Sequence, residues 1–244
     1  MRKMLVLARR EMASYFVSPM AYVIGALFLL FCGAVFFFGG YINIPIFEPG
    51  REASLRALFE VMALLMIVVA PLLTMKLVSE EFRSGTIETL MTSPVTDTQV
   101  VMGKFLGVMA FYLALVATTL VFLGLLYVYG QPDGGIALMG YLGMVLLGAA
   151  FISVGLFAST LTSYQIVAGI VGIAILGGMA GMTQLLIMNA GEPINYIAAR
   201  MNVLTYFRDF AKGVFDTRAV VFFLSVTAAF LFLSVKTLES RRWR

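Results

Sequence analysis

The sequence has 244 residues, of which 61% are hydrophobic and 12% charged, with a net charge of +4 and a mean hydropathy of +0.98. So few charges cannot cover a surface that faces water. The composition therefore excludes a soluble domain. Together with the apolar spans described below, we expect an all-α polytopic membrane protein, with residues 1–244 forming one transmembrane domain. Cys32 is the only cysteine and histidine is absent, which excludes an intrachain disulfide and a Cys/His metal site.

Residues 1–18 are expected to form an amphipathic helix at the membrane surface. Arg9, Arg10 and Glu11 interrupt any early apolar core, which argues against a cleavable signal peptide. On a helical wheel the apolar residues gather on one side, with Val6 and Leu7 as exceptions, which is typical of an interfacial helix. A basic tail that only fixes the topology is the alternative. The apolar side consists of Met1, Met4, Leu5, Ala8, Met12, Tyr15 and Phe16.

Six apolar stretches are long enough to cross a hydrocarbon core of about 30 Å as helices. Ser18-Pro19 gives the first stretch a cap and a favourable first helical residue. Pro71 is expected to kink the second stretch near its end. The predicted spans are residues 20–38, 58–78, 97–129, 135–160, 163–188 and 219–236.

The boundary between the fourth and fifth spans follows from length. Residues 134–191 contain no charged side chain, and these 58 residues would extend about 87 Å as one helix, too long for a single crossing. Ser159–Ser163 is the only polar cluster placed to reverse the chain. Thr162 and Gln165 have the spacing of a capping box, which predicts that the fifth span begins there.

The polar segment 79–96, here named the coupling segment, carries helix signals of its own. Ile87, Leu90 and Met91 recur at i, i+3 and i+4, which gives a short helix an apolar face. Glu88 lies in its first turn, where a negative charge suits the helix dipole, and Pro94 ends the helix. Because an apolar face between two spans needs a cover, we expect a separate ATPase subunit to bind it. The alternative is that this face lies on the membrane surface.

Further signals delimit the coupling segment. Gly85 or Thr86 can cap its helix, and Thr96 opens the third span with Gln99 at the capping-box spacing. The residues expected to contact the ATPase are Glu80, Glu81, Gly85, Thr86, Ile87, Glu88, Leu90, Met91 and Pro94.

Positive charges favour a topology with both termini in the cytoplasm. In that orientation the coupling segment is cytoplasmic and residues 192–217 are outside. Only a minority of the 17 basic residues then lie in outer segments: Arg51, Arg56, Arg200, Arg208, Lys212 and Arg218.

The outer segment 192–217 is apolar for an exposed loop. Asn202 or Thr205 could cap a helix that runs to Lys212, with Gly213 as its stop. We expect two short helices that dip back into the outer leaflet, although an interfacial hairpin without a gating role is the alternative. The aromatic residues expected at an outer gate are Tyr206, Phe207, Phe210 and Phe215.

Several short motifs together resemble the permease subunits of ABC-2 type transporters, and the gliding-motility-associated branch most of all. The resemblance covers nearly the whole chain. Its strongest part is the GT-x-E string followed by S-P between the second and third spans. The motifs lie at residues 71–76, 79–81, 84–88, 93–94, 103–106, 161–165 and 212–216.

The resemblance implies how such a chain is built and assembled. Residues 1–18, with Arg9, Arg10 and Glu11, would be the elbow helix that leads into the first span, and re-entrant helices between spans five and six would close the outer gate. The working unit would be two permease chains and two ATPase subunits, exporting a substrate across a bacterial inner membrane. Gly177 and Gly181 have the small-xxx-small spacing expected at a dimer interface, although contact with the chain's own helices is the alternative.

The motifs that are missing narrow the function further. Gly103-Lys104-Phe105 is the string nearest to a phosphate-binding loop, and it lacks the hydroxyl residue and the upstream glycine. The chain is therefore expected to have no catalytic residues, no metal and no bound cofactor, with ATP and Mg on the ATPase. No nucleic-acid partner is expected, whereas membrane lipid and an auxiliary envelope protein are candidate partners.

Two alternatives to an exporter remain open in the sequence. One is a membrane scaffold that transmits ATPase motion to an envelope or motility machine. The other is a secondary transporter, which is disfavoured because only Glu60 is a candidate coupling charge and it is expected near a helix end. The sequence does not identify the substrate.

Overall fold

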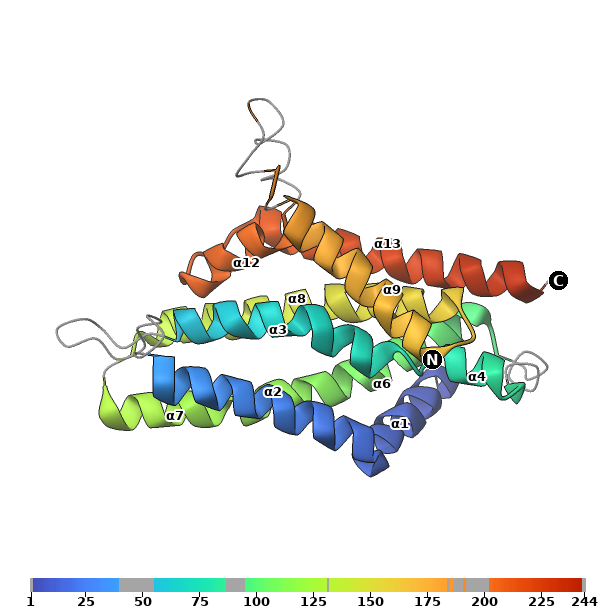
Figure 1. The fold of residues 1–244 in the computed structure, drawn as a ribbon, viewed down its shortest axis with the longest axis horizontal. Helices are drawn as coiled ribbons and strands as arrows, with labels where there is room; N and C mark the ends of the chain where they lie inside the picture. The colour runs from blue at the N-terminus through green and yellow to red at the C-terminus, as the bar shows by residue number, and fades with distance from the viewer. Residues whose placement is uncertain are drawn as a thin grey trace.

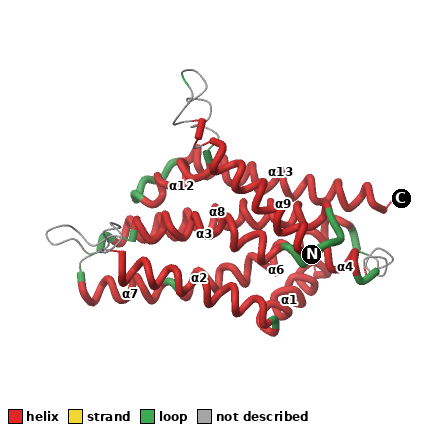
Figure 2. Tube along the Cα trace, in the orientation of Figure 1, coloured by secondary structure: helices red, strands yellow, loops and turns green. Residues whose placement is uncertain are grey.

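The computed structural model describes residues 2–39, 55–86, 95–130, 132–183, 185–186, 191 and 202–242. These parts of the chain are helical and contain no strand, as Figures 1 and 2 show. The elements are α1 (Arg2–Val17), α2 (Pro19–Phe38), α3 (Arg56–Thr74), α4 (Ser79–Arg83), α6 (Asp97–Thr118), α7 (Leu120–Tyr129), α8 (Gly134–Leu161), α9 (Gln165–Gly177), a π-helical turn (Gly178–Met182), α12 (Val203–Ala211) and α13 (Thr217–Arg242).

Five helical segments within the described ranges are long and apolar enough to cross a membrane. They are Pro19–Phe38, Arg56–Arg83, Asp97–Tyr129, Gly134–Leu161 and Thr217–Arg241. The predicted span 163–188 corresponds to a shorter apolar helix, Gln165–Gly181, and its last residues, 187–188, lie outside the described part. This helix changes from α to π geometry at Gly178, and glycine stabilises an α-helix poorly.

The central helix is α8, which packs against α3, α13, α6, α9 and α12. Small residues allow this close packing, because a Cβ atom at Gly148 would overlap the Tyr112 ring and one at Gly155 would overlap the Thr74 hydroxyl. Tyr112 uses the close approach to donate a hydrogen bond of 2.7 Å to the carbonyl of Met144. Small interfacial residues and side-chain hydrogen bonds between helices are typical of membrane helix packing.

The predicted span 58–78 is interrupted before its end. Pro71 lies inside α3, the helix ends at Thr74, and a turn precedes α4. Ser159 of α8 stabilises this break: its Oγ accepts hydrogen bonds from the backbone N–H groups of Val78 (3.0 Å) and Ser79 (3.1 Å). The same hydroxyl lies 3.1 Å from the carbonyl oxygen of Met75, to which it donates. Ser159 therefore satisfies backbone groups that the broken helix leaves unpaired.

Two of the four helix caps predicted within the described residues are present. Ser18 occupies the N-cap position of α2, which begins at Pro19, but its side chain makes no capping hydrogen bond. The capping box of Thr96 and Gln99 is confirmed, with hydrogen bonds of 3.3 and 3.4 Å. Asn202 is one of the two residues predicted to cap α12, and it does so: its side-chain oxygen accepts a hydrogen bond of 2.9 Å from the backbone N–H of Leu204. The predicted capping box at Thr162 is wrong: Thr162 accepts from the Tyr164 N–H instead, because α9 begins only at Gln165.

Candidate functional site

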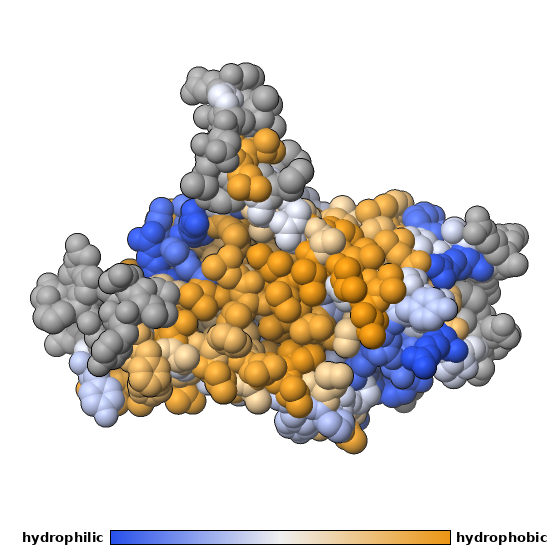
Figure 3. Space-filling view, in the orientation of Figure 1, coloured by the Kyte–Doolittle hydropathy of each residue, from blue (hydrophilic) through white to orange (hydrophobic). Residues whose placement is uncertain are grey.

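Side chains with opposite charges gather at the end of the molecule where α1, α4 and the start of α6 meet (Figure 1). In the space-filling view, hydrophilic surface covers this end and a broad apolar band covers the middle of the molecule (Figure 3). The contacts at this end link elements that are far apart in the sequence.

Helix α1 lies directly on α6, because two glycines one turn apart leave room for it. A Cβ atom at Gly103 would lie 2.9 Å from the Leu7 Cβ, and one at Gly107 would lie 2.6 Å from the Glu11 Cβ. Leu7 therefore faces the protein, while Leu5 is 59% exposed. The helical wheel placed Leu5 on the lipid-facing apolar side and left Leu7 as an exception. The packing of Leu7 against Gly103 explains that exception, and Gly103 and Gly107 are here named the glycine seam.

Lys104 connects three helices through buried charge. Its side chain is 1% exposed, and its amino group lies 2.7 Å from Glu81 Oε1 on α4 and 3.2 Å from Glu11 Oε1 on α1. Arg10 lies at the edge of the group, 3.4 Å from Glu11 and 4.0 Å from Glu81. We name Arg10, Glu11, Glu81 and Lys104 the charged cluster. A lysine is fully buried almost only when it is paired, as it is here.

A polar pocket of about 280 Å³ adjoins the charged cluster. The second carboxylate oxygen of Glu81, Oε2, is buried and has no hydrogen-bond partner among the residues that the structure describes. A buried acceptor of this kind is costly unless something donates to it. The pocket is lined by Glu11, Ser14, Lys76, Leu77, Glu80, Glu81, Ser84, Thr86 and Lys104.

Tyr15 provides a second link between α1 and α3. Its hydroxyl donates a hydrogen bond of 2.6 Å to the Leu73 carbonyl, and the Lys76 amino group lies 4.7 Å from the centre of its ring. Burial, and secondarily the charge of Glu11, raises the pKa of Tyr15, so the hydroxyl stays a donor. Lys76 donates to Ser18 Oγ at 3.1 Å, which engages the hydroxyl that was predicted to cap α2.

The C-terminal helix also contacts α4. The Arg241 guanidinium lies 4.6 Å from the centre of the Phe82 ring, and it donates to the carbonyl of Leu161, the last residue of α8. Helix α4, which begins the coupling segment, is therefore in contact with α1, α6, α8 and α13. A displacement of α4 would disturb all four of these helices.

The coupling segment is described only in part. Glu80 and Glu81 lie on α4, and Gly85 has a φ of +72°, the left-handed conformation typical of the residue after a helix. The Ser84 and Thr86 hydroxyls are hydrogen-bonded at 2.8 Å. The remaining predicted contact residues, Ile87, Glu88, Leu90, Met91 and Pro94, lie outside the described residues.

The aromatic residues predicted at the outer gate have different environments. Phe207 and Phe210 are buried beneath α12, whereas Phe215 is 55% exposed. Tyr206 stacks on Phe222 of α13, with 4.6 Å between the ring centres. Gly213 has a φ of +81° just after α12, as its predicted role as a stop requires.

The remaining predicted residues lie at the surface. Arg9 and Arg10 are exposed on α1. A Cβ atom at Gly177 or Gly181 would meet nothing within 4 Å. Neither glycine therefore packs tightly against another described part of its own chain, which was the alternative to a dimer contact.

Sequence reasoning missed Lys104, Tyr15 and Ser159 as connecting residues. Lys104 was noted as an inner positive charge and as part of the motif at residues 103–106, although its place within the apolar start of a span was a signal that it must be paired. Glu11 was recognised as a break in apolar sequence and as an elbow-helix residue, but not as a partner of Lys104. The pairing of Glu11 and Glu81 through one lysine becomes visible only once α1 has been placed across α6.

The described helices define a multi-pass membrane protein, since five of them can cross a membrane. A family model described as ABC-2 family transporter protein matches residues 5–238. The chain belongs to this family and is thus a membrane permease component of an ABC transporter, a class that works with a partner ABC ATPase. Such components are generally not themselves catalytic. No curated protein matches the sequence significantly.

Proposed function

We propose that this permease exports its substrate with energy from ATP that a separate ATPase subunit hydrolyses, and that the charged cluster carries the motion into the membrane. The observation that supports this most strongly is the position of Lys104, whose amino group lies within 3.2 Å of carboxylates from both α1 and α4. A displacement of the coupling segment would pull on Glu81 first, and through Lys104 on α6 and α1.

In this proposal the ATPase binds the coupling segment through Glu80, Glu81 and residues 85–94, and it holds the ATP and Mg. ATP binding closes the ATPase dimer, α4 moves, and the attached helices tilt to open a path. The contacts of α4 through Ser159 and Arg241 extend this motion to α8 and α13. Residues 206–215 would form the outer gate at the far end of the path.

We further propose a homodimer in a bacterial inner membrane, with both termini in the cytoplasm and Gly177 and Gly181 at the interface. No described part of the chain lies within 4 Å of a Cβ atom at either glycine, which supports this arrangement, since a second chain could approach there closely. The gliding-motility-associated branch and an auxiliary envelope protein remain proposals that rest on the sequence resemblance.

Secondary transport is a weaker proposal. Ion-coupled carriers need exchangeable charges inside the membrane. Among the buried residues that the structure describes, Lys104 is the charged one, and it lies near the start of α6 and is held by two carboxylates.

The experiment that tests the proposal uses the chain purified from its native membranes together with the ABC ATPase that accompanies it. ATP hydrolysis is measured in lipid nanodiscs for the wild type and for Lys104→Met. The proposal predicts that the variant complex hydrolyses ATP but no longer changes its rate with lipid or candidate substrate. A variant that responds like the wild type would refute the role of the cluster. A scaffold would show no response to substrate in either form.

A further inference from the structure

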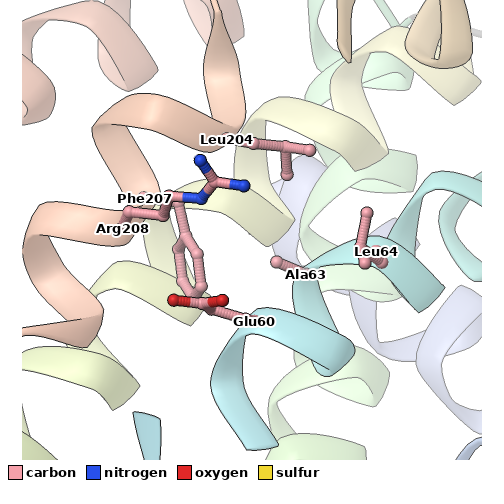
Figure 4. A pocket seen from close by; sticks show the side chains of 6 residues that line it. All are labelled: Glu60, Ala63, Leu64, Leu204, Phe207 and Arg208. Carbon is pink, nitrogen blue, oxygen red and sulfur yellow. The ribbon is translucent and has the colours of Figure 1, made fainter. Parts of the chain in front are cut away.

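A second pocket lies between α3 and α12, at the end of the molecule opposite the charged cluster. We name it the α3–α12 pocket; it has a volume of about 50 Å³ and an open side. Because roughly 10–15 Å³ of such volume already accommodates a water, a group of several atoms fits there. The pocket is lined by Glu60, Ala63, Leu64, Leu204, Phe207 and Arg208 (Figure 4).

The two charged residues of this pocket differ in how they are neutralised. Glu60 accepts from Arg56 one turn earlier on α3, with 3.3 Å between Oε1 and Nε. The Arg208 guanidinium makes no hydrogen bond or ion pair with any residue that the structure describes. In Figure 4 it lies beside the Phe207 ring, away from the Glu60 carboxylate. Counting only the described residues, the charge of the pocket that lacks a partner is therefore positive.

The walls of the pocket are apolar and continue onto the surface of α3. Leu64 is 53% exposed, and Val68, one turn further along the same face, is 44% exposed. Helix α3 belongs to a segment that can cross a membrane. Arg208 lies near the first turns of α3, because it lines the same pocket as Glu60 and Ala63. The pocket thus combines a guanidinium that has no partner among the described residues with adjoining hydrocarbon surface.

We propose that the α3–α12 pocket binds the phosphate-bearing headgroup of an anionic membrane lipid. Arg208 binds the phosphate, because a guanidinium matches phosphate oxygens with two parallel hydrogen bonds. One acyl chain lies against Leu64 and Val68. The negative charge of Glu60 lowers the affinity for the phosphate, and the ion pair of Glu60 with Arg56 weakens this repulsion. This proposal concerns a ligand of the outer segment and does not depend on ATPase coupling.

The test is native mass spectrometry of the purified full chain, released from nanodiscs that contain phosphatidylglycerol or phosphatidylcholine. The wild type should retain one phosphatidylglycerol more tightly than Arg208→Gln by roughly tenfold, the effect of losing charge-assisted hydrogen bonds. Arg218→Gln is the matched control, since Arg218 is exposed nearby on α13 and does not line the pocket. It should retain lipid like the wild type.

Several outcomes would overturn the proposal. Equal retention by Arg208→Gln and the wild type would remove Arg208 from the site, and an equal loss in Arg218→Gln would indicate unspecific surface attraction. Equal retention of phosphatidylcholine would exclude a preference for anionic lipid. Displacement of the lipid by an equal concentration of glycerol 3-phosphate would identify a site for a soluble anion. Glu60→Gln should bind more tightly, and weaker binding would place the headgroup elsewhere.

Discussion

The amino group of Lys104 lies 2.7 Å from Glu81, a residue 23 positions earlier in the chain. The Lys104 side chain is 1% exposed and that of Glu81 is 17% exposed. Glu11, 93 positions away from Lys104, contacts the same amino group. Buried ion pairs contribute little net stability, but removing one partner leaves an uncompensated charge. The cluster is therefore better suited to fix the relative positions of three helices than to stabilise the protein.

This property leads to the first prediction. Lys104→Met should lower the free energy of unfolding by about 3 kcal/mol, the lower end of the range for breaking a buried pair, because two half-buried carboxylates lose their cation. Replacing Glu11 and Glu81 by Gln in the same chain should recover most of that loss. Thermal unfolding in detergent measures both effects. Lys236→Met, which breaks an exposed pair with Glu239, is the control and should cost less than about 1 kcal/mol.

The glycine seam gives the second prediction. Gly107→Ala should displace α1 from α6 and lower the unfolding temperature, because the new Cβ would lie 2.6 Å from the Glu11 Cβ and close to the α1 backbone. Gly124→Ala is the matched control in the same predicted span, since a Cβ there meets nothing within 4 Å. It should leave stability unchanged or raise it slightly. Equal effects of the two substitutions would show that α1 does not rest on this seam.

The break after α3 gives the third prediction. Ser159→Ala should cost about 1–3 kcal/mol, since the N–H groups of Val78 and Ser79 would lose their acceptor. Hydrogen exchange at these two amides should accelerate. Ser153→Ala is the control, because the Ser153 hydroxyl bonds only within its own helix, to Ala150. Unchanged protection of residues 78 and 79 would contradict this role of Ser159.

Much of this fold can be read from the sequence, because apolar length and local caps determine where helices begin. The Thr96 cap, the Asn202 cap and the reversal after Leu161 all depend on residues within a few positions of one another. The interruption after α3 was not predicted in full. Pro71 indicated a kink, but the acceptor that stabilises the broken end, Ser159, comes from a helix some 80 residues later.

The candidate site was harder to predict for the same reason. The elbow residue Glu11 and the coupling residue Glu81 were each identified, but nothing local connects them. Their common partner, Lys104, lies on a third helix, and the seam that brings α1 to it depends on Gly103 and Gly107. Long-range pairing of charges follows from tertiary packing, which helical periodicity alone does not determine.

The fourth prediction concerns the dimer. In a chain with Cys32→Ala, Gly177→Cys should form a disulfide-linked dimer under mild oxidation in membranes, since no described residue lies within 4 Å of a Cβ atom at this position. A cysteine at Gly169, which faces Met75 of its own chain, should not. Gel electrophoresis without reductant measures the result. Crosslinks that form only from the first or third span would exclude this interface.

The most direct test of the proposed function asks whether the coupling segment binds the ATPase. Ile87→Asp combined with Leu90→Asp changes no predicted span, so the chain should still insert and dimerise. The double variant should release the ABC ATPase that co-purifies with the wild type from native membranes, because burying two unpaired carboxylates in an interface is strongly unfavourable. The amount of ATPase retained on the tagged chain is the readout. We predict its loss, whereas retention at the wild-type level would contradict the assignment of residues 79–96 as the ATPase contact.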